Sequence, residues 1–206
     1  MAKTAEELLR VATGLFAQRG YDGTSVRDIC KAAGANVNAV SYHFGGKQAL
    51  YAQILGRLGD QRMEGARRIL GDPPQDSRDF ATRMLLHAEE TLATYLREPE
   101  LLIIMMAEFS QGFPRVDESA LASFYEQHQV LIDFLNAARR RKLLRKGVDP
   151  DIVAGALQER LTYQVLYAGR IQAMYGQSVL EPDYRRHWVR QTVELLLFGA
   201  ARERLD

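Results

Sequence analysis

Residues 25–44 read SVRDICKAAGANVNAVSYHF, and this stretch decides the predicted fold of the chain. Ser25 and Asp28 have the spacing of a capping box, which opens a short helix that ends at Gly34. A second short helix is expected over residues 37–43. Two short helices around a glycine turn are typical of a helix-turn-helix, which presents its second helix to the DNA major groove, although a plain helical hairpin would show the same spacing. The apolar residues of the stretch fall at Val26, Ile29, Ala33, Val37, Val40 and Phe44.

The side chains expected on the exposed side of these helices suit a nucleic acid. An asparagine amide such as that of Asn38 pairs with adenine edges, while Val37 and Ala39 offer apolar contact to a thymine methyl. Arg27 and Lys47 can reach phosphates, and the free amides at a helix N-terminus also favour a phosphate. The predicted DNA contacts are Thr24, Ser25, Arg27, Asn36, Val37, Asn38, Ala39, Ser41, Tyr42, His43 and Lys47.

Helix signals continue outward from this stretch and predict an all-α protein. The 206 residues are 47% hydrophobic and 26% charged, which is the composition of a globular protein with ample material for a core. About nine helices and no strand are expected, over residues 4–20, 25–34, 37–43, from 47 toward a stop at 71, from 76 or 77 to 96, 99–112, 117–144, 149–175 and 181–204.

The sequence argues against several other classes of protein. Cys30 is the single cysteine, which excludes an internal disulfide framework, and four histidines without metal spacing argue against a metal centre. No nucleophile elbow or glycine-rich phosphate loop appears, so we expect no enzyme and no cofactor. A nucleophilic Cys30 is the alternative, but its small and apolar neighbours favour a buried, inert thiol. With no apolar run of about 20 residues and no signal peptide, we expect a cytoplasmic protein without a membrane partner.

Residues 20–29, GYDGTSVRDI, resemble the start of the DNA-binding domain of TetR/AcrR-family transcriptional regulators. The match continues at residues 33–34, 40–44 and 47–50, so that the resemblance covers roughly residues 4–58. The loop from residue 42 to residue 47 is similar to that of a subgroup near the CecR repressors.

The resemblance has three departures. Ser41 stands where members commonly carry tyrosine, Asn36 where many have a serine cap, and Gly45-Gly46 where Pro-Ser is usual. The first departure leaves open which side chain supplies the usual phosphate contact, and Tyr42 is the natural substitute.

The resemblance implies a homodimer that binds a palindromic operator and is released by a ligand. Residues 1–58 would form the helix-turn-helix domain, and residues 59–206 would form the ligand-binding and dimerisation domain. The charge distribution is consistent with this division, because residues 1–58 carry seven Lys and Arg against four Asp and Glu. A DNA architectural protein with a filled body and no ligand is the alternative.

The last two helices, about 150–175 and 183–204, are predicted to hold the dimer. Their apolar arcs are about twice as wide as one core-facing stripe requires, so each has a face left for a partner. On the wide arc of the final helix, Leu196 lies near Val189 and Leu195 lies roughly 100° to one side. A helix at the centre of a monomer would show the same pattern.

Polar side chains on otherwise apolar stripes are the candidates for binding an effector, predicted to be small and mostly apolar. Methionine and aromatic side chains would supply adaptable walls. Each of them could also be ordinary core. The predicted ligand-binding residues are His87, Met105, Met106, Phe109, Phe124, His128, Tyr163 and Tyr167.

Overall fold

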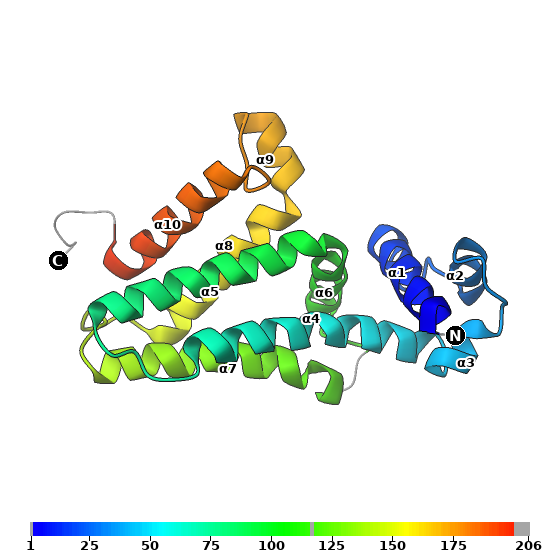
Figure 1. The fold of residues 1–206 in the computed structure, drawn as a ribbon, viewed down its shortest axis with the longest axis horizontal. Helices are drawn as coiled ribbons and strands as arrows, with labels where there is room; N and C mark the ends of the chain where they lie inside the picture. Colours follow the sequence, from blue (N-terminus) through cyan, green and yellow to red (C-terminus); the bar gives the residue numbers. More distant parts are fainter. Residues whose placement is uncertain (1, 116–117, 200–206) are drawn as a thin grey trace. The chain divides into compact units, whose positions relative to one another are not determined.

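The computed structural model describes residues 2–115 and 118–199, which form ten helices and no strand (Figure 1). The all-α prediction is confirmed. The expected helix over 149–175 is two helices, because the backbone leaves helical geometry at Tyr167 (φ −111°, ψ 12°). The helices are α1 Ala2–Arg19, α2 Val26–Ala32, α3 Ala39–Phe44, α4 Lys47–Leu70, α5 Ser77–Arg97, α6 Pro99–Gln111, α7 Glu118–Arg140, α8 Pro150–Leu166, α9 Ala168–Tyr175 and α10 Pro182–Phe198.

Most helix ends follow the local signals in the sequence. Gly20 stops α1 with a left-handed φ of +72°, and Gly112 stops α6 with a φ of +76°. Pro99 occupies the first turn of α6, where its missing N–H costs nothing. Helix α7 ends four residues before the predicted Leu144, since Lys142 adopts a φ of +60° that no α-helix continues. The predicted extension of the last helix to 204 lies outside the described residues.

The first of two compact units contains residues 1–61 and 98–125. Its core includes the fully buried side chains of Leu8, Ile29 and Val40, which join α1, α2 and α3. Helix α6 packs against α1 within this unit. The unit is therefore larger than the predicted head of residues 1–58.

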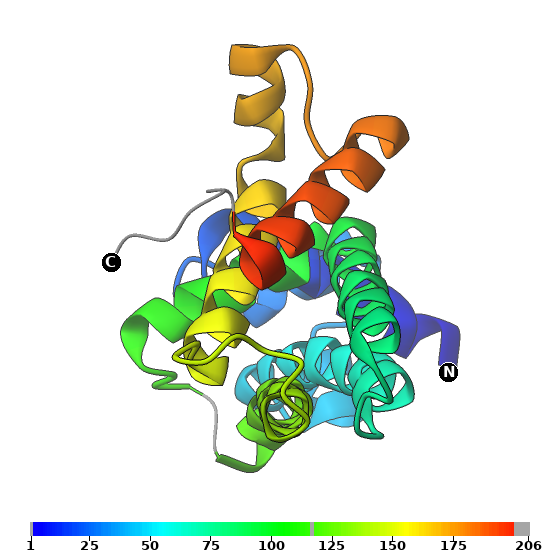
Figure 2. The ribbon, with the colours of Figure 1, turned by 90° about the vertical axis from the view of Figure 1, so that its left-hand side faces the viewer.

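The second unit contains residues 62–97 and the chain from 126 onward. Helix α5 packs against both α8 and α10, and Figure 2 shows α10 crossing over α8 in this unit. Tyr95, Leu92 and Leu161, each at most 1% exposed, lie in its core. Across the described ranges, no helix combines the length and the apolar character that crossing a membrane requires.

Candidate nucleic-acid interface

Helix α2 is fixed at both ends by short-range hydrogen bonds. The Ser25 hydroxyl accepts the Asp28 N–H at 3.1 Å, and the Asp28 carboxylate accepts the Ser25 N–H at 3.2 Å, which confirms the predicted capping box. Hydrogen bonds from Ser25 lower the pKa of Asp28. At the other end, Gly34 turns the chain with a φ of +62°, and the Ala35 N–H donates to the Cys30 carbonyl at 2.8 Å.

Helix α3 begins two residues later than the sequence predicts. The Asn36 side chain accepts the Asn38 N–H at 2.9 Å, so the asparagine closes a turn before the helix rather than capping its first residue. Ile29 and Val40 are fully buried between the two helices. Cys30 is 2% exposed, and its thiol lies 3.6 Å from the Val37 carbonyl, as the prediction of a buried thiol expects.

The outer side of this motif presents the predicted DNA contacts together. Tyr42 is 74% exposed and Val37 is 54% exposed, although both are large side chains that burial would favour. Arg27, Asn36, Asn38 and Ser41 are also exposed, while Ala39, His43 and Lys47 are half-buried. A short helix that leaves polar and apolar groups uncovered on one side is a surface suited to a partner.

The structure corrects the prediction that Thr24 binds a phosphate. Thr24 is 1% exposed, and its hydroxyl lies 2.9 Å from the Gly20 carbonyl and 3.2 Å from the Leu15 carbonyl. Its N–H donates to the Tyr21 carbonyl. Thr24 therefore ties α1 to the following turn and has no donor left for DNA.

Ser25 is exposed, but its hydrogen-bonding groups are also engaged. Both its hydroxyl and its N–H lie within hydrogen-bond distance of the Asp28 carboxylate. A carboxylate in the first turn already occupies the positive end of this helix, so the predicted phosphate contact of Ser25 would compete with Asp28.

Lys47 lies over an aromatic ring that also contacts an arginine, and sequence reasoning missed both contacts. Its ammonium lies 3.9 Å from the centroid of the Tyr21 ring, and the Arg115 guanidinium lies 5.3 Å from the same centroid. Arg115 donates to Asp22 at 2.7 Å and to Glu108 at 2.9 Å. No local pattern could reveal these contacts, because they join the α1–α2 connection to the chain beyond α6.

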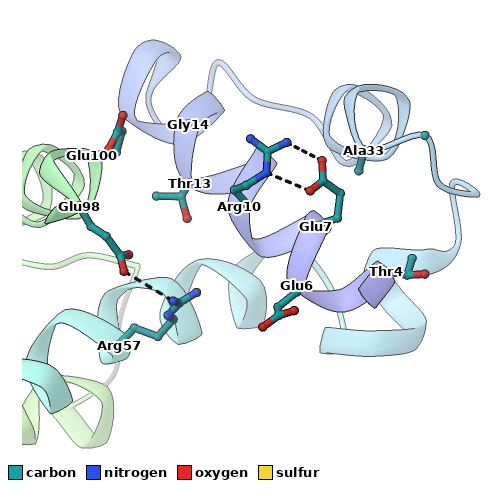
Figure 3. A pocket seen from close by; sticks show the side chains of 11 residues that line it. Thr4, Glu6, Glu7, Arg10, Thr13, Gly14, Ala33, Arg57, Glu98 and Glu100 are labelled. Atoms are coloured by element: carbon teal, nitrogen blue, oxygen red, sulfur yellow. Dashed lines mark hydrogen bonds and ion pairs between the residues drawn. The ribbon is translucent and has the colours of Figure 1, made fainter. Parts of the chain in front are cut away.

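Another arginine of the first unit, Arg10, lies on α1. It lines a cavity of about 780 Å³ beside α1, where it donates to Glu7 with its Nε at 2.9 Å from a carboxylate oxygen (Figure 3). That hydrogen bond lowers the pKa of Glu7. On another wall of the cavity, Arg57 pairs with Glu98 at 3.7 Å. The charge of Arg10 is thus largely balanced within α1.

The two predicted ligand-binding histidines lie in the second unit around a buried arginine. His87 is 2% exposed, and burial, with the nearby charge of Arg62, lowers its pKa to about 4. Burial and Arg62 also lower the pKa of His128, which is half-buried. Arg62 itself is 5% exposed, donates to Gln158 at 2.8 Å, and stacks over Tyr95. Sequence reasoning missed Arg62, which sits on a helix face with no distinguishing spacing.

The other predicted ligand-binding residues are divided between the two units. Met105, Met106 and Phe109 belong to the first unit, and Phe109 is 55% exposed. Tyr163 and Tyr167 touch each other, with ring centroids 4.7 Å apart, but are 56% and 41% exposed. All three aromatic side chains are exposed in the described chain, and their role as ligand contacts stays a prediction. The side chain of Phe124 lies outside the described residues.

Apolar side chains remain uncovered along α8 and α10. Val189, Val193 and Leu197 face the core, whereas Leu195 is 46% exposed and Phe198 is 62% exposed. The same two helices meet at Arg160, whose guanidinium lies 5.5 Å from the Trp188 ring centroid. On α8 the exposed groups include Ile152 and the two tyrosines. We use the name α8–α10 face for the exposed Ile152, Tyr163, Tyr167, Leu195 and Phe198 together with the half-buried Trp188.

Known proteins share the motif and the fold. Residues 8–54 match the family model of bacterial regulatory proteins of the tetR family. Over 107 residues the chain is 32% identical to the HTH-type transcriptional regulator AcrR of Shigella flexneri, covering 50% of this chain and 48% of AcrR. It is 25% identical over 139 residues to the HTH-type transcriptional dual regulator CecR of the same organism, covering 64% of this chain and 59% of CecR. The chain thus spans about half the length of the first relative and less than two thirds of the second.

A solved structure covers nearly the whole chain. The TetR family transcriptional regulator PfmR from Thermus thermophilus matches with a TM-score of 0.75 and 19% identity, over 95% of this chain and 96% of PfmR. This likeness supports the fold. The matched proteins are transcriptional regulators, in agreement with the prediction that the chain is not an enzyme.

Proposed function

We propose that this chain is a transcriptional regulator of the TetR/AcrR family, which it matches at residues 8–54, and that it represses transcription from a palindromic operator as a homodimer. The observation that carries the proposal is the exposed side of α3, where Asn38, Ser41 and Tyr42 are uncovered on a helix anchored by buried Val40. Two such helices related by a two-fold axis require two inverted half-sites. Residues 1–58 supply DNA binding, and residues 59–206 supply ligand binding and dimerisation, in the cytoplasm.

The test uses an operator selected from random DNA and separates two kinds of contact. Arg27→Ala should weaken binding to operator and random DNA alike and flatten the slope of log K against log salt by about one unit, since it removes one phosphate contact. Asn38→Ala should cost about 1–3 kcal/mol on the operator only, if its amide reads a base edge.

Lys31→Ala is the matched control, because Lys31 is an exposed cation on α2 outside the predicted contacts. Fluorescence anisotropy at several salt concentrations measures all three variants. Wild-type affinity in both Arg27→Ala and Asn38→Ala would show that this motif does not bind DNA.

We propose further that a small, mostly apolar effector enters the second unit and lowers operator affinity. His87 and His128 are the polar groups that would orient it, since the charge of Arg62 acts on both of them. A ligand acts only through its different affinities for two states of the protein. A typical coupling of about 1–3 kcal/mol would weaken operator binding about 5- to 150-fold.

The effector is sought by thermal-shift screening of aromatic and lipophilic compounds, followed by operator titration with each hit. His128→Ala should lose the response to the hit while keeping the operator affinity of the ligand-free protein. His187→Ala changes an exposed histidine of α10 and should respond as wild type does. Loss of DNA binding in His128→Ala without ligand would mark His128 as a structural residue.

A further inference from the structure

The first unit holds a cavity of about 320 Å³ that the proposed function does not use. It is lined by α1, the α1–α2 connection, α4 and α6, through side chains that include Phe16, Tyr21, Tyr51 and Ile104. The rings of Phe16 and Tyr21 are stacked, and the ring of Tyr51 lies edge-on to both, with centroids 4.9–5.9 Å apart. Ligand clefts measure about 300–1,000 Å³, so this cavity accommodates a one-ring molecule.

Glu108 brings a buried acceptor to this cavity. The residue is 1% exposed and lines the cavity wall. Its Oε1 accepts both the Tyr51 hydroxyl, at 3.0 Å, and Arg115 Nη1, at 2.9 Å. Its Oε2 is buried and has no hydrogen-bond partner among the described residues. Leaving a buried carboxylate oxygen unsatisfied is costly, so a donor that reached Oε2 from the cavity would gain a charge-assisted hydrogen bond.

The charges around Glu108 restrict what that donor can be. Arg115 already pairs with Glu108 and with Asp22, and all three groups line the cavity. Arg19 also lines the cavity, so two guanidinium groups stand against two carboxylates, and an ammonium ion on the ligand would be repelled by the first pair while it is attracted by the second. An anionic ligand would meet two carboxylates. An uncharged O–H or N–H group satisfies Oε2 without either penalty, and an aromatic ring packs well against Phe16, Tyr21 and Tyr51.

We propose that this cavity is a second small-molecule site, which binds an uncharged aromatic compound whose one O–H or N–H group donates to Glu108 Oε2. The site lies wholly within the first unit. It is separate from the effector site proposed around His87 and His128, and its binding test contains no DNA. Failure of this site would leave the DNA-binding proposal unaffected.

The experiment compares four probes that share one ring, namely phenol, toluene, benzylamine and benzoate, with the full-length protein. Calorimetry measures affinity, and amide chemical shifts locate the probe. Phenol should bind and shift amides within residues 16–23 and 103–115. Toluene should bind at least about tenfold more weakly, because it lacks the donor. Benzylamine, protonated at neutral pH, and benzoate should bind more weakly still.

Two variants check the contacts. In Glu108→Gln the amide oxygen stays with Tyr51 and Arg115, so an NH₂ group replaces Oε2, and phenol affinity should fall at least about tenfold. Ala107→Leu extends a cavity-lining alanine and should block phenol without touching the carboxylate. Ala173→Leu, at an exposed alanine of α9, is its control and should bind phenol normally.

The proposal fails if toluene binds as tightly as phenol, or if phenol shifts only amides outside the two segments. It also fails if folded Ala107→Leu keeps wild-type phenol affinity. Absence of phenol binding at millimolar concentration would mean that the cavity holds solvent only.

Discussion

Leu195→Glu is expected to convert the dimer to a monomer and to abolish operator binding at concentrations where the wild-type protein is bound. Leu195 is 46% exposed on the α8–α10 face, so a partner subunit seated there would bury the new carboxylate against apolar groups. Burying an unpaired charge costs several kcal/mol, and about 3 kcal/mol would weaken dimerisation more than about 100-fold. Sedimentation velocity over a range of protein concentrations measures the effect.

The α5 residue Leu86 provides a matched control, because it is also 46% exposed but lies outside the α8–α10 face. Leu86→Glu should remain dimeric and should bind operator normally. Both variants should retain the circular dichroism of a helical protein. A dimeric Leu195→Glu would remove the α8–α10 face from the interface, and a monomeric Leu86→Glu would show that loss of the dimer is not specific to that face.

His87 is expected to make the second unit less stable at acidic pH. Its pKa is about 4 in the folded protein against 6.5 for an ordinary histidine, because burial and then Arg62 disfavour the charged ring. Above pH 6.5 the ring is neutral in both states and contributes no pH dependence. As the pH falls toward 4, His87 takes up a proton in the unfolded chain but stays mostly neutral in the folded chain. The free energy of unfolding therefore falls by about 3 kcal/mol.

Urea unfolding of wild type and His87→Gln at about pH 7 and about pH 4.5 tests this dependence, at one fixed protein concentration because dimerisation affects stability. Carboxylates titrate in the same range, so the informative quantity is the difference between the two proteins. The wild type should lose more stability than His87→Gln, while exposed His187→Gln should behave as wild type. Equal losses in wild type and His87→Gln would contradict the burial of a neutral His87.

The sequence predicts the helices well where a terminator is local. Gly20, Gly112 and Pro99 act through their own backbone preferences, and the corresponding helix ends agree with prediction. Tyr167 carries no such preference, so the break between α8 and α9 could not be read from its residue type. Tertiary packing, rather than propensity, decides where that helix ends.

The exposed side chains of the candidate site could be predicted from the sequence, but the buried and long-range contacts that support them could not. Asn38 and Tyr42 follow from the spacing of a helix-turn-helix, because helical periodicity separates the outer side from the buried one. The same spacing could not tell that the hydroxyl of Thr24 turns inward to two carbonyls. Arg62 and Arg115 find their partners on distant segments, and only the folded chain brings those segments together.

Because Cys30 is buried, its rate of reaction with a thiol reagent can measure how often α2 and α3 separate. The chain has one thiol, it is 2% exposed, and it lies on the helix behind α3. A thiol-specific reagent can react with it only after α2 and α3 separate. When α2 and α3 close again faster than the thiol reacts, the labelling rate of Cys30 gives the free energy of this local opening. No engineered probe is needed. Operator DNA that binds α3 should lower the labelling rate of Cys30, and DNA that does not bind should leave this rate unchanged.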